Sequence, residues 1–232
     1  MDKLNLETYR DNPFIKALEK SESACFVGDS VTEGTENGGV PWYEPLMMNY
    51  PDVDVTNVSK GGINAKELLE MLRSRKVESD IAVIAIGCND IRYRSETGCM
   101  TSEEYVTTVD AIVSYLRRSA KAVFAVAPWP SASFDPFCKI TEEMKIGLYG
   151  EYIEALKKYC ESEGVTLSNP CPAIVEYLDL NPRSPMLVDH IHPTAEGTEM
   201  YSRLFLDHMN RIHAHMLHES VADKNPRPLK IR

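Results

Sequence analysis

Short apolar runs recur along most of the chain and are separated by amphipathic segments. These runs predict strands over 24–28, 81–86 and 122–127. The alternating segment 53–58 predicts a further strand, and a short fifth strand is expected over 165–167. The run over 81–86 is continuously apolar, which is typical of a central parallel strand covered on both faces. Strands that alternate with helices predict an α/β fold with helices on both faces of a parallel sheet. For five strands, the flavodoxin-like order 2-1-3-4-5 is the simplest expectation.

Polar residues of the capping type precede several of the amphipathic segments. Asn64 with Glu67, and Thr101 with Glu104, have the spacing of a capping box at a helix start. The apolar positions that follow share one helix face: Ala65, Leu68, Leu69 and Leu72 in the first helix, and Tyr105, Val109, Ile112, Val113 and Leu116 in the second. Further helices are predicted over 42–49, 141–161 and 174–178. Thr194 is expected to cap a final helix with Tyr201, Leu204, Phe205 and Ile212 on one face.

The sequence predicts one domain with short extensions at both ends. Residues 1–22 are expected to form a surface helix or loosely docked arm, interrupted by Pro13. Residues 23–218 form the main domain, since no composition shift, long linker or internal repeat divides them. Residues 219–232, with Pro226 and Pro228, are expected to be a flexible tail.

Composition narrows the class of protein further. The 232 residues suffice for a well-buried core, and the net charge of -10 argues against a nucleic-acid partner and against docking on anionic membranes. The longest apolar run is far too short for membrane insertion, and the N-terminus does not resemble a signal peptide. Six cysteines without a CxxC pair favour free thiols, and hence a cytoplasmic protein.

Gly28-Asp29-Ser30 stands where the first strand ends, a position at which α/β folds display a nucleophilic serine. A serine hydroxyl needs a base, and His192, with Asp189 three residues before it, can supply one. His190 competes with His192 for this role. In the expected strand order, Ser30, Gly62 and Asn89 lie beyond three neighbouring strand ends, where such sheets bind ligands.

These residues can also stabilise the oxyanion that forms during acyl transfer. We expect the donors to be the backbone N–H groups of Ser30 and Gly62 and the side-chain amide of Asn89. A glycine at 62 lets the backbone approach the substrate closely, although Gly61 is an alternative donor. Asn suits position 89 because its NH2 group donates without bringing a negative charge.

Four segments, taken together and in order, resemble the signature blocks of the SGNH (GDSL-type) hydrolase superfamily. They are Gly28-Asp29-Ser30, Gly62, Gly87-x-Asn89-Asp90 and Asp189-x-x-His192. The resemblance spans residues 24 to 205 and implies a three-layer α/β/α fold and ester hydrolysis by a serine nucleophile without a metal. Cys88 departs from the threonine that is frequent in the family.

Other polar residues have simpler explanations. Asp29 and Asp90 are expected to tie down their loops rather than to act in catalysis. Near the C-terminus, His208, His213, His215 and His218 invite a metal site, but 213 and 215 point about 200° apart on a helix. We therefore expect a solvated helix end there, with no metal and no cofactor. Cys25 and Cys88 are expected to be inert.

Aromatic and basic residues gather in the loops of the expected active-site edge. Trp42, Arg92, Tyr93 and Trp129 are the candidate substrate-binding residues, with Tyr43, Arg94 and Phe134 nearby. Such a cleft stacks on sugar rings and favours a short acyl group, such as acetyl, on a carbohydrate or other small-molecule ester. The alternatives are an O-acyltransferase with the same acyl-enzyme, a lysophospholipase or thioesterase, and a non-enzymatic binding module.

Overall fold

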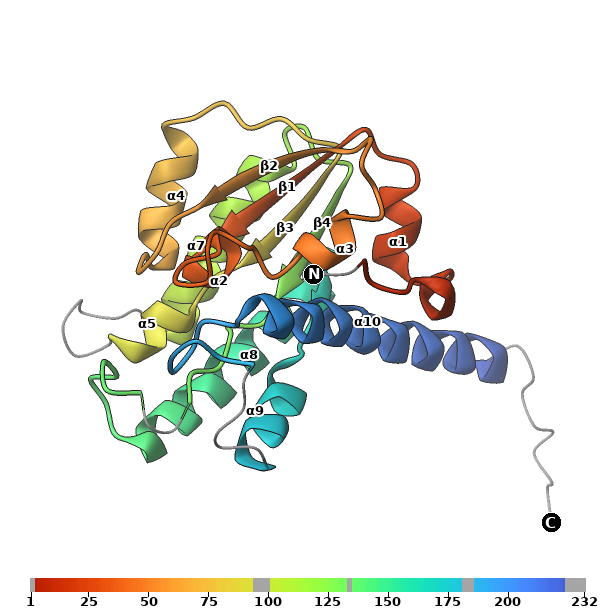
Figure 1. Ribbon diagram of the computed structural model, residues 1–232. Helices are drawn as coiled ribbons and strands as arrows, with labels where there is room; N and C mark the ends of the chain where they lie inside the picture. The colour runs from red at the N-terminus through yellow and green to blue at the C-terminus, as the bar shows by residue number, and fades with distance from the viewer. Residues whose placement is uncertain (1–2, 94–100, 133–134, 181–185, 224–232) are drawn as a thin grey trace, which may run out of the picture.

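A computed structural model describes residues 3–93, 101–132, 135–180 and 186–223, without the side chains of 179–180 and 212–223. Its central sheet contains β1 (Ser23–Gly28), β2 (Asp54–Ser59), β3 (Ile81–Ala85), β4 (Ala122–Val126) and β5 (Thr166–Ser168). All pairs are parallel and the order is β2-β1-β3-β4-β5 (Figure 1), which confirms the predicted topology.

Successive residues of β1, β3 and β4 face opposite helical layers, whereas the first four residues of β2, at one edge of the sheet, are exposed. In β1, Cys25 and Val27 pack with α4 (Ala65–Arg73), α7 (Ser102–Leu116) and α8 (Glu142–Glu163). Ala24 and Phe26 pack on the other face, with α1 (Pro13–Leu18), α3 (Glu44–Met47) and α10 (Ala195–Asp223). The three-layer α/β/α fold is therefore confirmed.

Local sequence sets the starts of the long helices. Both expected capping boxes are present, Asn64 with Glu67 on α4 and Thr101 with Glu104 on α7. Thr194 caps α10, because its hydroxyl accepts from the Gly197 N–H at 3.0 Å. The remaining helices are the 3-10 turn Glu7–Tyr9, α2 (Ser30–Glu33), α5 (Cys88–Arg92) and α9 (Cys171–Leu180). None of the helices that the structure describes is long and apolar enough to cross a membrane.

The N-terminal segment differs from the loosely docked arm that we expected. Pro13 begins α1 instead of interrupting a helix, because a proline at the first helical position loses no hydrogen bond. Phe14 is fully buried, and Asn12 both caps α1 and donates to the Leu206 carbonyl at 3.0 Å. The packing of α1 against α10 thus makes this segment part of the core.

Helix α10 continues to Asp223, past the expected limit at 218. The rest of the expected tail, 224–232, lies outside the described residues, as do Arg94, Cys99 and Phe134 and the side chains of Ile212, His213, His215 and His218.

Candidate active site

Ser30 is the first residue of α2 and directly follows the end of β1. Asp29 caps this short helix by accepting from the Val31 N–H at 3.2 Å. Only glycine fits at 28, because a Cβ there would lie 2.4 Å from the Ala85 carbonyl oxygen and from the Thr32 hydroxyl. The tight turn therefore explains Gly28 and Asp29, and it leaves Ser30 only 5% exposed.

The turn after β2 lies next to Ser30. A Cβ on Gly61 would come within 3.8 Å of the Ser30 Cβ. The Gly61 N–H donates to the Glu33 carboxylate at 2.7 Å, so this N–H is already engaged. Gly62 has a φ of 76°, which a residue with a side chain adopts only with strain. Beyond Gly62 and its chain neighbours, no atom of the described residues lies within 4 Å of the position that a Cβ on Gly62 would take, so a ligand can approach this residue.

Asn89 lies in α5, beyond the end of β3, and is 3% exposed. Its Nδ2 donates to the Ile63 carbonyl at 2.9 Å, and its Oδ1 accepts from Arg92 Nη1 at 3.3 Å. The neighbouring Asp90 accepts from the Ala65 N–H at 3.2 Å through either oxygen. Asn89 and Asp90 therefore hold the segment that follows Gly62 against α5.

Asp29 and Asp90 are buried carboxyl groups that the expected chemistry does not use. Burial, followed by the charge of Asp90, raises the pKa of Asp29 to about 7. Burial likewise raises the pKa of Asp90 to about 7. Their hydrogen bonds to backbone N–H groups agree with the structural role that the sequence suggested for both.

Asp189 and His192 lie in a loop that closes just before α10. The loop is joined at its base by the Val188 N–H, which donates to the His192 carbonyl at 2.8 Å. Asp189 Oδ2 lies 2.7 Å from His192 Nδ1, and Oδ1 accepts from the N–H groups of Ile191 and His192. Although burial opposes it, these donors lower the pKa of Asp189.

The partnership with Asp189 determines where His192 holds its proton. A carboxylate only accepts, so the proton resides on Nδ1 and leaves a lone pair on Nε2. His192 Nε2 is buried and has no hydrogen-bond partner in the described part of the chain.

The loop of Asp189 and His192 is also tied to the loop that follows α2. Asn37 Nδ2 donates to the Pro193 carbonyl at 2.9 Å.

His190, the alternative base, is engaged elsewhere. Its Nε2 lies 2.7 Å from Arg92 Nη2, and a guanidinium has no lone pair, so Nε2 must accept. Burial, the largest influence, lowers the pKa of His190, which disfavours the charged form of the ring. With its Nε2 lone pair occupied, His190 is a poor base, and His192 is the better candidate.

The structure corrects three of the expected substrate-binding residues. Trp42 and Trp129 are fully buried and pack against each other, with ring centroids 5.4 Å apart, in the core beneath α10. Arg92 is 3% exposed and forms an ion pair with Asp135, so it does not line an open cleft. Tyr93 is half-buried beside the Arg92 guanidinium, and its contact with substrate stays a prediction.

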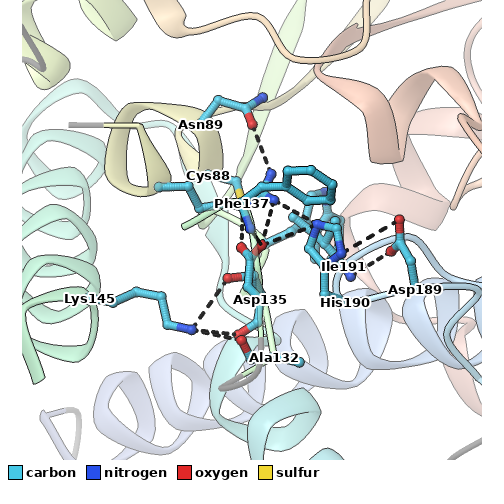
Figure 2. Close-up of polar contacts among 12 residues, drawn as sticks. Cys88, Asn89, Ala132, Asp135, Phe137, Lys145, Asp189, His190 and Ile191 are labelled. Carbon is cyan, nitrogen blue, oxygen red and sulfur yellow. Dashed lines mark hydrogen bonds and ion pairs between the residues drawn. The ribbon is translucent and has the colours of Figure 1, made fainter. Parts of the chain in front are cut away.

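Four residues near the site were not identified from sequence. Glu33 holds Gly61, Asn37 holds Pro193, and Asp135 pairs with Arg92. Phe137 is 56% exposed, and its ring centroid lies 5.1 Å from that of His190 (Figure 2). No local sequence pattern marks these contacts, because the partners lie far apart in the chain or on irregular loops.

Cys25, Cys88 and His208 have the ordinary structural roles that we expected for the cysteines and for the C-terminal histidines. Burial raises the pKa of Cys25 and of Cys88 to about 12, which disfavours the reactive thiolate. His208 Nδ1 accepts from the Asn169 N–H at 3.0 Å. In the described ranges, no group of three or more His, Cys, Asp or Glu residues is arranged to hold a metal ion.

Family comparison agrees with this fold. The model of the GDSL-like lipase/acylhydrolase family matches residues 26–200, and the chain belongs to that family. It is accordingly a carboxylic-ester hydrolase.

Two solved structures share the fold. Axe2, an acetylxylan esterase from Geobacillus stearothermophilus, is 20% identical with a TM-score of 0.61, over 81% of this chain and 94% of that one. A member of the lipolytic protein G-D-S-L family from Veillonella parvula is 16% identical with a TM-score of 0.61, over 80% and 96%. No curated protein matches the sequence.

Proposed function

We propose that the protein is a serine esterase that hydrolyses short-chain esters, chiefly acetyl esters, of a carbohydrate-like alcohol through an acyl-Ser30 intermediate. The observation that carries this proposal is the 2.7 Å contact between Asp189 and His192 Nδ1. It leaves the buried Nε2 with a lone pair and no partner among the described residues. Ser30, in the first signature block of the family, is the hydroxyl that we assign to this base.

In the first half of the reaction, Ser30 Oγ attacks the ester carbonyl carbon while His192 Nε2 takes the hydroxyl proton. The carbonyl electron pair moves to oxygen. When the tetrahedral intermediate collapses, the bond to the alcohol oxygen breaks, and His192 returns the proton to the departing alcohol. A water molecule then repeats the sequence on acyl-Ser30, which releases the carboxylic acid and restores the serine.

Three donors are available in our proposal for the oxyanion. The first N–H groups of a helix have no partner inside it, so the Ser30 N–H can point at the substrate. Between the two neighbouring glycines we choose Gly62, because the Gly61 N–H donates to Glu33. Asn89 Nδ2 uses one hydrogen on the Ile63 carbonyl, which leaves the second for the oxyanion.

A short acyl group on a carbohydrate remains the substrate class that we favour. The fold similarity to Axe2, an acetylxylan esterase, supports it. Phe137 takes the place of the buried tryptophans as the candidate stacking residue, because it is 56% exposed and lies beside His190. We also infer a cytoplasmic location, because Cys25, Cys88, Cys138, Cys160 and Cys171 are free thiols.

Turnover of 4-nitrophenyl acetate by the parent and by Ser30→Ala tests the mechanism. Ser30→Ala should fold normally and lose on the order of 10³-fold or more in kcat, because no covalent path remains. Ser162→Ala, which removes an exposed hydroxyl from α8, is the matched control and should keep parental activity. A folded Ser30→Ala protein with parental turnover would refute the mechanism.

A substrate panel tests the specificity separately. Acetate release from acetylated xylooligosaccharides should exceed release of longer acids from a chain-length series of esters. A preference for long acyl chains would favour a lipase or thioesterase, and transfer of acetyl to an added sugar in place of water would favour an acyltransferase. Phe137→Ala should raise KM for the acetylated sugar more than for 4-nitrophenyl acetate.

A further inference from the structure

A buried network joins Asn89 to the loop that carries Asp189 and His192. Asn89 stands at one end of this network and Asp189 at the other, with Asp135 and His190 between them (Figure 2). Arg92, on the same short helix as Asn89, is the cation at its centre.

The Asn89 amide can be held in one of two orientations, related by a flip that exchanges its oxygen and nitrogen. Arg92 Nη1 donates to Oδ1 at 3.3 Å, and the Ile63 carbonyl accepts from Nδ2 at 2.9 Å. A guanidinium can only donate and a carbonyl can only accept, so the flipped amide would face two repulsive contacts. Arg92 therefore fixes which end of the amide is the donor.

Arg92 is itself held rigidly. Its Nε and Nη2 reach the two oxygens of Asp135 at 2.5 and 3.0 Å, which is the bidentate geometry of an arginine–carboxylate pair. Both side chains are at most 4% exposed. Four of the five guanidinium N–H groups are used, by Asp135 twice, by Asn89 and by His190. Arg92 therefore has no pair of free N–H groups with which to bind a substrate.

The Arg92–Asp135 pair also contacts the loop that carries Asp189 and His192. Arg92 Nη2 donates to His190 Nε2 at 2.7 Å, and His190 stands between Asp189 and His192 in the chain. The His190 carbonyl accepts from the Ala132 N–H at 2.7 Å, and the Ala132 carbonyl accepts from buried Lys145 at 2.8 Å. Asp135 also accepts from the Phe137 N–H at 3.0 Å.

We propose that Arg92, held by Asp135, is a positioning residue that aims the free Asn89 N–H at the acyl oxygen. This inference rests on the proposed function, because it requires Ser30 esterase chemistry with Asn89 as an oxyanion donor. It replaces the substrate-binding role that the sequence suggested for Arg92. The alternative is a purely structural ion pair.

A double-mutant cycle separates the two explanations. Arg92→Lys keeps a charge near Asp135 but cannot grip it bidentately, and it should lower kcat about 10- to 100-fold with little change in KM. In an Asn89→Ala background, Arg92→Lys should lower kcat less than about threefold, because no amide is left for Arg92 to position. Arg117→Lys, at an exposed pair with Glu163, is the matched control and should have no effect.

Asp135→Asn provides a second route to the same conclusion if Arg92→Lys does not fold. It keeps the shape of the carboxylate but weakens the grip on Arg92, and its loss of kcat should also shrink in the Asn89→Ala background. Equal losses in both backgrounds, or parental kcat in folded Arg92→Lys and Asp135→Asn proteins, would overturn the positioning role while leaving the esterase intact. A folded Ser30→Ala protein with parental activity would instead overturn the proposed function, and this inference with it.

Discussion

Replacement of Asn89 separates catalysis from stability, because the side chain makes distinct contacts for each. Its structural bonds go to the Ile63 carbonyl and to Arg92, and our proposal gives its second N–H to the oxyanion. In Asn89→Ala, the buried groups left without partners should cost about 1–3 kcal/mol of unfolding free energy. Loss of the oxyanion donor should raise the barrier by about 3–4 kcal/mol, which lowers kcat about 10²- to 10³-fold with little change in KM.

Asn89→Asp makes the prediction sharper. The carboxylate keeps the size of the amide but sets a negative acceptor beside the developing oxyanion and opposite the Ile63 carbonyl. We expect kcat to fall at least as far as in Asn89→Ala. Asn210→Ala is the matched control: it removes contacts to Asn12 and to the Thr8 carbonyl, so it should lower Tm and leave kcat unchanged.

The assay is kcat and KM with 4-nitrophenyl acetate, together with Tm, for the parent and the three variants. If Asn89 were merely structural, its variants would behave like Asn210→Ala, with lower Tm and near-parental kcat in the folded fraction. A kcat within about threefold of the parent in folded Asn89→Asp would refute the reasoning.

Three further predictions concern the surroundings of the site. Burial and then the charge of Asp90 raise the pKa of Asp29 to about 7, above the ordinary value of 3.8, so the folded state binds this proton more tightly and loses stability as pH rises from about 4 to 7. Asp29→Asn should therefore raise the free energy of unfolding more at pH 8 than at pH 5, by about 3 kcal/mol at 1.36 kcal/mol per pKa unit between pH 5 and 7. The larger gain at pH 8 should appear as a larger rise in Tm, and an equal gain at both pH values would contradict this. Glu33→Ala should lower kcat about tenfold, an effect the size of one hydrogen bond, because it releases the turn at Gly61. Glu33→Gln keeps an acceptor and should recover most of the lost kcat. Parental kcat in both variants would show that Glu33 does not support catalysis. Activity should survive EDTA, because every step is assigned to a protein group, and loss with EDTA that a divalent metal restores would require a different mechanism.

The strands β1, β3 and β4 were predictable because each is a local apolar run, and β2 was predictable from its alternation of apolar and polar residues. The order of the strands followed from the alternation with helices, and the capping boxes at Asn64 and Thr101 needed only residues three positions apart. Gly28-Asp29-Ser30 could be recognised because it directly follows the apolar run of β1, although the contact that requires glycine at 28 comes partly from Ala85 on β3.

Contacts between distant segments were not predictable in this way. Trp42 and Trp129 lie in loops on the expected edge of the sheet, but α10 packs over them and makes them core residues. Arg92 finds Asp135 at a separation of 43 residues, across an irregular loop with no periodic signal. The choice between Gly61 and Gly62 likewise depended on Glu33, whose carboxylate engages the Gly61 N–H.

Covalent labelling with a fluorophosphonate, mapped by peptide mass spectrometry, identifies the nucleophile, which we assign as Ser30. The Ser30 oxygen would attack phosphorus and expel fluoride, which forms a stable adduct shaped like the tetrahedral intermediate. We predict a single adduct on the peptide that contains Ser30, much slower labelling in His192→Ala, and no adduct in Ser30→Ala. An adduct on another residue, or unchanged labelling of Ser30→Ala, would contradict the assignment.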